Sequence, residues 1–417
     1  MLKINNNNIN SNRIHKITEI VQNGGYNKIN ERLDFIKVLL DGTDLKPMIN
    51  FTDNEINHNN KDSNIFNLLE KKSKSFKSTI KLIGGKLLYI KSGTTGHTFK
   101  GISYPDSNNP EICINYAVKI VAYPKKENYG DIQDSARPEN AELLMLKILS
   151  SFVVNNQTPH VVLPIATFNT NINMFISLTK NNIITNKKYE QFVQKCETNE
   201  FHDTVSVLIS EWADGGDLLD YLRESYDKLS IREWRVIFFQ ILSVLAVIQT
   251  KYPGFRHNDL KANNILLQKI NNVDKNNIYK YNINNNEYYV PNIGLRIKLW
   301  DFDFACIPGE IDNSKVFADW TDRINVKPEP HPYYDVHYFF NTLTSKNFIP
   351  QYKNIPEEVQ KFIERIIPKC VKNGTNSTER GRLLLDYDEI LEMPEIKYKT
   401  PEEIIKFDPF FAKMRPK

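Results

Sequence analysis

Residues 255–267 contain side chains whose types and spacing suit the transfer of a phosphoryl group. The segment holds Asp259, then Lys261 two positions later and Asn264 five positions after the aspartate. Such a reaction needs a carboxylate directed at the attacking hydroxyl, positive charge beside the phosphates and oxygen ligands for magnesium. Asp259 can accept the hydroxyl proton, Lys261 can neutralise the moving group, and Asn264 can bind a metal ion through its amide oxygen. We interpret these three residues as the catalytic centre.

The same segment, H-N-D-L-K-x-x-N at residues 257–264, resembles the catalytic loop of the protein kinase family, with Asn258 at a position where the family has arginine. Residues 301–303, Asp-Phe-Asp, resemble the D-F-G segment, with Asp303 in place of the glycine. The resemblance implies that Asp301 and Asn264 bind the Mg²⁺ that bridges the phosphates of ATP.

Upstream segments resemble the nucleotide-binding motifs of the same family, in the same order. Residues 90–101 partly match the glycine-rich loop, and residues 116–120 resemble its V-A-I-K strand, which implies that Lys119 contacts the α- and β-phosphates. Glu142 is then the expected ion-pair partner of Lys119, and Glu139, one helical turn earlier, is the competing candidate. Residues 207–218 resemble the hinge, whose backbone groups hold adenine. The nucleotide-binding residues implied by the resemblance are Ile90, Lys91, Ser92, Gly93, Thr94, Thr95, Gly96, His97, Thr98, Lys119, Glu142, Glu211 and Ala213.

Hydrophobic patterning predicts strands early in the chain and helices later. The predicted strands are 82–90, 116–121, 161–168 and 206–210, and the predicted helices are 29–40, 138–152, 217–226, 231–250, 334–343, 356–367 and 401–406. The Asn-rich inserts 180–204 and 271–292 are expected to be surface loops. Together with the resemblance, this pattern predicts an α+β, bilobal kinase-like fold with an Asn-rich extension (1–78), an N-lobe through the hinge (79–213) and a C-lobe (214–417).

Composition excludes several other classes of protein. The net charge of +4 is mild and the basic residues are dispersed, so we expect no nucleic-acid binding. The apolar run 236–248 is too short for a membrane span and is expected to be a buried helix. Four widely separated cysteines indicate free thiols in a reducing compartment. We expect a cytoplasmic protein, in the host cytoplasm or virion if its source is viral, with a protein that carries serine or threonine as its substrate.

Several features leave alternatives open. The D-F-D segment and the run Tyr-Tyr-Asp-x-His-x-Phe at 333–339 resemble divergent serine/threonine kinases of large DNA viruses, whereas H-N-D with D-F-D also resembles choline and aminoglycoside kinases. An ATP-binding pseudokinase is a third reading, because the glycine-rich loop is altered. No A-P-E motif occurs in the activation segment, residues 301–335, so the resemblance does not extend to the family's platform for the substrate peptide. Asn258 stands where the family has the arginine that pairs with a phosphate on this segment, so we expect no regulation by that phosphate.

Four residues in or near these motifs need a separate interpretation. His257 is expected to pack beneath the turn at residues 301–302, with no role in proton transfer. Asp335 resembles the buried aspartate that holds the catalytic loop; the alternative interpretation is an ordinary helix N-cap, and the two roles are compatible. His331 and His337 lack the further ligands that a metal site would require.

Overall fold

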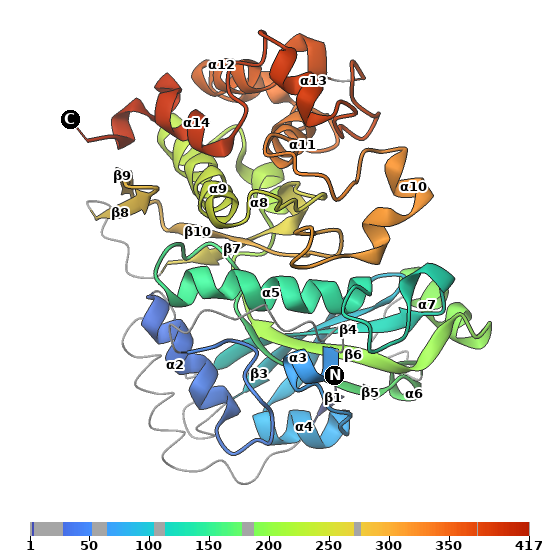
Figure 1. Ribbon diagram of the computed structural model, residues 1–417. Helices are drawn as coiled ribbons and strands as arrows, with labels where there is room; N and C mark the ends of the chain where they lie inside the picture. The colour runs from blue at the N-terminus through green and yellow to red at the C-terminus, as the bar shows by residue number, and fades with distance from the viewer. Residues whose placement is uncertain are drawn as a thin grey trace. The chain divides into compact units, whose positions relative to one another are not determined.

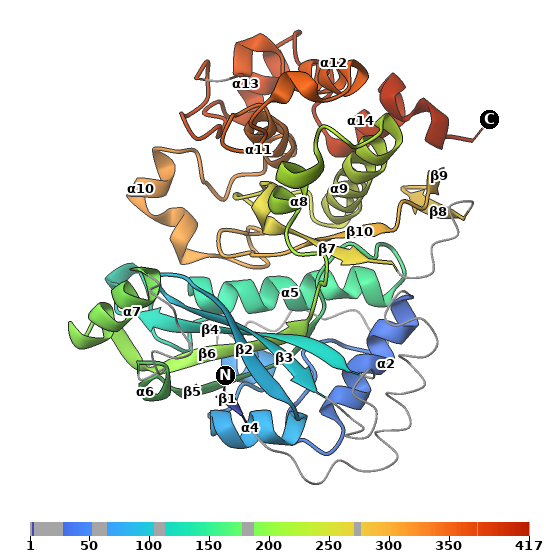
Figure 2. The same cartoon turned by 180° about the vertical axis from the view of Figure 1, so that it is seen from behind.

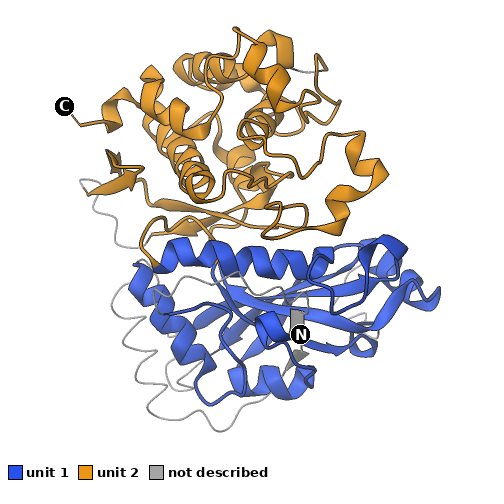
Figure 3. Cartoon of the chain, viewed as in Figure 1, with its two compact units in different colours: residues 1–154, 163–212 blue, residues 155–162, 213–417 orange. Residues whose placement is uncertain are grey.

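The computed structural model describes residues 2–3, 28–51, 65–103, 113–176, 187–270, 277–372 and 374–416. The chain forms two compact units (Figure 3): unit 1 contains residues 1–154 and 163–212, and unit 2 contains residues 155–162 and 213–417. A sheet dominates the first unit and helices dominate the second, which confirms the predicted α+β class.

Unit 1 is built on one antiparallel sheet with the strand order β1-β2-β3-β4-β6-β5. The helix α5 runs along this sheet in both views of the molecule (Figure 1, Figure 2). The strands are β1 (Leu2–Lys3), β2 (Lys86–Ser92), β3 (Gly96–Ser103), β4 (Ile114–Pro124), β5 (Pro164–Asn171) and β6 (Phe201–Glu211). The helices are α2 (Ile29–Leu40), α3 (Ile65–Leu69), α4 (Phe76–Ile83), α5 (Pro138–Val154), α6 (Asn173–Ile176) and α7 (Lys187–Glu197).

The segment before β2 covers the edge of the sheet. The amide of Met48 donates to the carbonyl of Ile165 on β5 at 2.9 Å, and residues 72–74 exchange two backbone hydrogen bonds with Asn169 on the same strand. An uncovered edge strand would present unpaired amide and carbonyl groups. These residues therefore pack as part of unit 1 and complete the hydrogen bonding of β5.

Unit 2 is mainly helical and is organised around α9. This helix begins after a capping box at Ser230, and it is buried continuously from Trp234 to Ile248, which confirms the predicted buried helix. The helices are α8 (Leu218–Ser225), α9 (Ile231–Lys251), α10 (Asp319–Asp322), α11 (Tyr334–Leu343), α12 (Glu357–Ile366), α13 (Tyr387–Glu392) and α14 (Pro401–Phe407). Two two-stranded antiparallel sheets complete the unit: β7 (Ile265–Lys269) pairs with β10 (Leu295–Leu299), and β8 (Ile278–Ile283) forms a hairpin with β9 (Asn286–Pro291).

Three local predictions were wrong. The insert at 180–204 contains α7 and the start of β6, and the insert at 271–292 contains the hairpin β8–β9; residues 180–186 and 271–276 lie outside the described part of the chain. The buried Phe192 of α7 and Tyr288 of β9 supply apolar contacts that the Asn-rich composition obscured. Leu82 belongs to α4, which ends at Ile83 with Gly84 as its C-cap, so the following strand begins later than predicted. None of the described helices is long and apolar enough to cross a membrane.

Candidate active site

The ion pair between Lys119 and Glu142 lies inside unit 1. Lys119 is on the central strand β4 and Glu142 is in the second turn of α5. The Lys119 Nζ lies 2.7 Å and 2.9 Å from the two carboxylate oxygens of Glu142. The competing candidate, Glu139, instead accepts a 3.0 Å bond from Arg137. The geometry therefore places Glu142, and not Glu139, beside the lysine.

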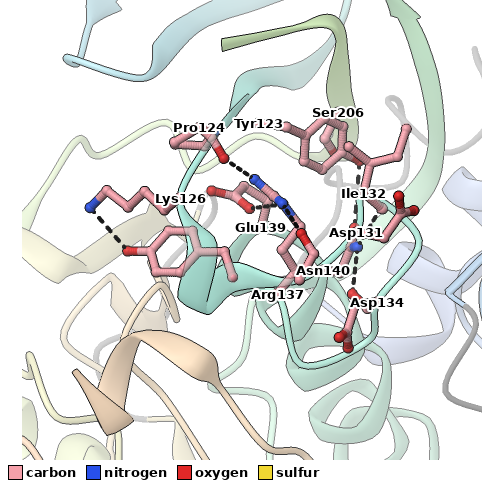
Figure 4. Close-up of polar contacts among 12 residues, drawn as sticks. Tyr123, Pro124, Lys126, Asp131, Ile132, Asp134, Arg137, Glu139, Asn140 and Ser206 are labelled. Carbon is pink, nitrogen blue, oxygen red and sulfur yellow. Dashed lines mark hydrogen bonds and ion pairs between the residues drawn. The ribbon is translucent and has the colours of Figure 1, made fainter. Parts of the chain in front are cut away.

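A buried polar network fixes the start of α5 (Figure 4). The Arg137 guanidinium donates to the carbonyls of Gly130 and Pro124, and the Asn140 amide donates to the carbonyls of Ile132 and Asp134 at 3.0 Å and 2.8 Å. Because these acceptors belong to the connection between β4 and α5, the helix is tied to the strand that carries Lys119. This arrangement holds Glu142 in position without an external ligand.

Lys71 joins this network from the N-terminal segment. Its ammonium donates to Tyr123 Oη at 2.7 Å and to Ser206 Oγ at 2.8 Å, and it lies 3.4 Å from Asn140 Oδ1. Burial lowers the pKa of Lys71 to about 7, although Glu139 partly opposes that shift. Nothing in the sequence around Lys71 distinguished it from the other lysines, so its role was not predicted.

The glycine-rich segment forms the turn between β2 and β3. The amide of Gly93 donates to the carbonyl of Gly96 at 2.8 Å, which closes the turn. A Cβ on Gly96 would lie 1.8 Å from the carbonyl oxygen of Ile120, so glycine is required there by the neighbouring strand, whereas a Cβ on Gly93 would meet no atom closer than 3.9 Å. Within residues 90–98 only 93–95 lie outside β2 and β3, and of the two glycines only Gly96 is required by packing.

His97 points its side chain away from solvent. It is buried against Phe192 of α7, with ring centroids 4.4 Å apart, and its Nδ1 lies 2.8 Å from Ser92 Oγ. Burial lowers the pKa of His97 to about 4, so the ring is neutral at physiological pH. The resemblance implies a nucleotide-binding role for His97, but its side chain packs α7 onto the turn.

Glu211, at the end of β6, makes a buried ion pair with Arg32 of α2. The Arg32 Nε lies 2.9 Å from one carboxylate oxygen, and the other oxygen accepts the amide of Leu163 at 2.8 Å. The Glu211 side chain is therefore bonded within unit 1, and its backbone amide donates to the carbonyl of Leu163 at 3.1 Å. Ala213 is buried and is the first residue of the longer segment of unit 2.

The catalytic loop of unit 2 is held by Asp335 of α11. Its carboxylate accepts the amides of His257 and Asn258 at 2.7 Å and 2.9 Å. Asn258 has φ of 61°, a left-handed conformation that asparagine tolerates better than most residues. His257 packs against Phe302 with ring centroids 5.0 Å apart, and its Nε2 lies 3.0 Å from the carbonyl of Trp300. The predicted structural roles of Asp335 and His257 are confirmed.

Three side chains contact the carboxylate of Asp259. Lys261 Nζ lies 3.2 Å from Oδ1 and 3.0 Å from Oδ2, and Asn264 Nδ2 donates to Oδ2 at 2.8 Å. The third is Arg382, whose Nη2 donates to Oδ1. Sequence reasoning missed Arg382, because 123 residues separate it from the aspartate and it belongs to no motif that we identified.

Asn264 and Asp301 are suited to a magnesium ion that also binds phosphate. The Asn264 amide nitrogen is used by the backbone and carboxylate of Asp259, so its oxygen is the atom suited to a metal. The backbone amide of Trp300 donates to the backbone carbonyl of Asn264 at 3.3 Å, which brings the neighbouring Asp301 beside the catalytic loop. Mg²⁺ commonly takes one or two protein ligands and completes its shell with water and phosphates.

The segment that follows Asp301 is held by the side chains of Asn258 and Lys315. The side-chain amide of Asn258 donates to the backbone carbonyls of Phe304 and Lys327 at 3.1 Å and 3.3 Å. Lys315 pairs with Asp303 and lies over the Phe304 ring at 3.9 Å. Asp303, which stands at the position of the glycine in the D-F-G segment, thus forms an ion pair within this segment.

His331 and His337 are buried beside backbone carbonyls. His337 Nε2 lies 2.6 Å from the carbonyl of Val371, and His331 Nε2 lies 3.2 Å from that of Leu385. Burial lowers the pKa of His331 to about 3 and that of His337 to about 4. Among the residues that the structure describes, no three histidine, cysteine or acidic side chains are grouped as a metal site would require.

Comparison with known proteins identifies relatives along most of the chain. Residues 116–319 match the family described as "Protein kinase domain". A protein of Acanthamoeba polyphaga mimivirus named "Putative serine/threonine-protein kinase" is 45% identical over 393 residues, which cover 92% of this chain and 80% of that protein. A second mimivirus protein with the same description is 27% identical over 340 residues, 71% of this chain and 83% of its own length. The maternal embryonic leucine zipper kinase of Danio rerio is 39% identical over 66 residues, 16% of this chain and 9% of that kinase.

Proposed function

This chain belongs to the protein kinase family, and we propose that it transfers the γ-phosphoryl group of ATP to a serine or threonine hydroxyl of a protein substrate. The observation that carries the proposal is the arrangement around Asp259, where one carboxylate is oriented by Lys261 and Asn264. The serine/threonine preference draws support from Lys261 and from the names of the two mimivirus relatives.

In this reaction the substrate oxygen forms a bond to the γ-phosphorus of ATP while the bond from that phosphorus to the ADP oxygen breaks. The hydroxyl proton passes to the carboxylate of Asp259, and Lys261 neutralises charge on the transferred group. Lys119, oriented by Glu142, binds the α- and β-phosphates. Magnesium, held by Asn264 and Asp301, would supply positive charge at the phosphates.

The turn between β2 and β3 is proposed to bind phosphate through backbone amides other than that of Gly93, and the backbone at residues 211 and 213 is proposed to bind adenine. For the activation segment, we propose that the Asn258 contacts replace a regulatory phosphate, since they order the segment with uncharged groups. We further propose that the protein works in the cytoplasm of the host or in the virion if its source is viral.

The test is transfer of labelled phosphate from ATP with magnesium to a mixed protein substrate and, in parallel, to choline, aminoglycoside and sugar acceptors. Asp259→Ala removes the proton acceptor but no group proposed to bind ATP, so we expect transfer to fall by at least roughly 10²-fold while ATP binding persists. Labelled phosphoserine or phosphothreonine that disappears in this variant supports the proposal. Labelled small molecules would indicate the choline-kinase type, and ATP binding without transfer by the unaltered protein would indicate a pseudokinase.

A further inference from the structure

Arg382 reaches the catalytic loop from a turn between α12 and α13. The turn is closed by the Arg382 amide, which donates to Thr378 Oγ1 at 3.0 Å, and by the Thr378 amide, which donates to the Arg382 carbonyl at 2.8 Å. Asn341 of α11 fixes the turn by donating to the carbonyl of Gly381 at 3.0 Å. The arginine is therefore presented by a braced part of unit 2.

The guanidinium of Arg382 is bonded at its edge and stacked at its face. Its Nη1 donates to the carbonyl of Asn258, its Nη2 donates to Asp259 Oδ1, and its planar face lies 4.5 Å from the centre of the Tyr338 ring. Nη1 also lies 3.4 Å from Tyr334 Oη. Burial opposes the charge, but Tyr334, Tyr338 and Asp259 together raise the pKa of Arg382. A planar group stacked on one side and bonded at its edge has little freedom to turn.

The two cations on Asp259 differ in their ability to move. The Lys261 side chain is 25% exposed and carries its charge on a flexible stem, whereas the Arg382 side chain is 8% exposed. In the proposed reaction Lys261 must follow the transferred phosphoryl group. Asp259 would then keep only Asn264 as a partner among these groups, unless a second cation stayed in place.

We propose that Arg382 is a positioning residue for phosphoryl transfer, which holds one oxygen of Asp259 throughout the reaction while Lys261 moves between the carboxylate and the phosphoryl group. This inference rests on the proposed function. Arg382 is then the fixed cation, which orients the Asp259 carboxylate, and Lys261 is the mobile cation, which neutralises the charge of the phosphoryl group. Arg382 also braces the left-handed backbone of the loop through the Asn258 carbonyl.

The experiment compares Arg382→Met and Arg382→Lys with the unaltered protein in the same phosphate-transfer assay. Misdirection of a catalytic group by about 1 Å can cost roughly 10²-fold, so we expect kcat of Arg382→Met to fall by about that factor. The KM for ATP should stay within about threefold, because the groups that bind the phosphates are intact. Arg382→Lys keeps the charge but cannot contact the loop carbonyl and the carboxylate together, so its kcat should be intermediate.

Arg235→Met is the matched control. Arg235 is likewise buried in unit 2 and stacked on an aromatic ring, with its guanidinium 5.0 Å from the centre of Phe410, but it bonds Glu358 and a backbone carbonyl far along the chain from the catalytic loop. Its loss should lower the melting temperature without the selective fall in kcat. Millimolar guanidinium should restore part of the activity of Arg382→Met and none of that of Arg235→Met.

Three results would overturn the inference in a protein whose unaltered form is active: an unchanged or higher kcat in Arg382→Met, a proportional change in KM for ATP, or no response to guanidinium. If Arg382→Met does not fold, the inference is tested with Arg382→Lys instead. The melting temperatures of Arg382→Lys, Asp259→Asn and the double variant are then compared in a double-mutant cycle. Coupling between these two changes supports the contact, and strict additivity contradicts it. Failure of the proposed function is recognised separately, by lack of transfer in the unaltered protein.

Discussion

Lys71 makes the stability of unit 1 depend on pH. Its ammonium is buried among Tyr123, Ser206 and Asn140, and burial lowers its pKa from 10.5 to about 7. The unfolded chain therefore binds more protons than the folded chain between these two values, so this residue makes the folded state more stable as pH rises. Replacement by methionine removes this dependence.

The expected size follows from the same two values. At about 1.4 kcal/mol for each pKa unit, the free energy of unfolding of the unaltered protein should rise relative to Lys71→Met by about 3 kcal/mol between pH 6.5 and 9.5. Urea unfolding, followed by circular dichroism across this range, measures the difference. Lys77→Met removes a lysine from an exposed position of α4 and reports the effect of net charge alone.

The reasoning would be refuted if the difference between the unaltered protein and Lys71→Met varied by less than about 1.4 kcal/mol, which is one pKa unit, over that range. A fall in the relative stability of the unaltered protein as pH rises would also refute it. Either result would mean that the ammonium is hydrated in solution or keeps its charge by another route.

Two further predictions concern ion pairs that sequence reasoning did not find. Arg32→Met should lower the free energy of unfolding by about 3–5 kcal/mol, because Glu211 would remain buried without its cation. In urea unfolding, a double variant that also carries Glu211→Leu should lose less stability than the sum of the losses in the two single variants. Asp303→Gly should change the free energy of unfolding by no more than about 1 kcal/mol, because the ion pair of Asp303 with Lys315 is partly exposed. Limited proteolysis should nevertheless cut residues 303–327 faster in this variant than in the unaltered protein. Equal rates of cleavage would contradict the role of this ion pair.

The elements that sequence patterning predicted best are those with strong local signals. The helices α2 and α11 were predicted with their observed bounds, since apolar residues recur along each at helical spacing. Lys119 and Glu142 could be paired because each lies in a recognisable motif. By contrast, α7 and the hairpin β8–β9 lie in Asn-rich inserts, and their burial depends on a few aromatic residues whose partners are distant in the sequence.

The same reason explains which site contacts were missed. Arg32, Lys71 and Arg382 each pair with a residue at least 52 positions away, and the pairs were visible only once the fold had brought them together. Local spacing carries information over a few helical turns or a strand pair. It contains no signal for a single buried cation that arrives from another part of the chain.

The long separation of Arg382 from Asp259 also has a consequence for the timing of synthesis. Asp259, the proposed proton acceptor, is made 123 residues before Arg382, which bonds its carboxylate. At about 5–20 residues per second, a ribosome needs roughly 6–25 s to cover that distance. During this interval the nascent chain already contains Asp259, Lys261 and Asn264 but lacks the fixed cation, so full activity would appear only when nearly the whole of unit 2 has emerged.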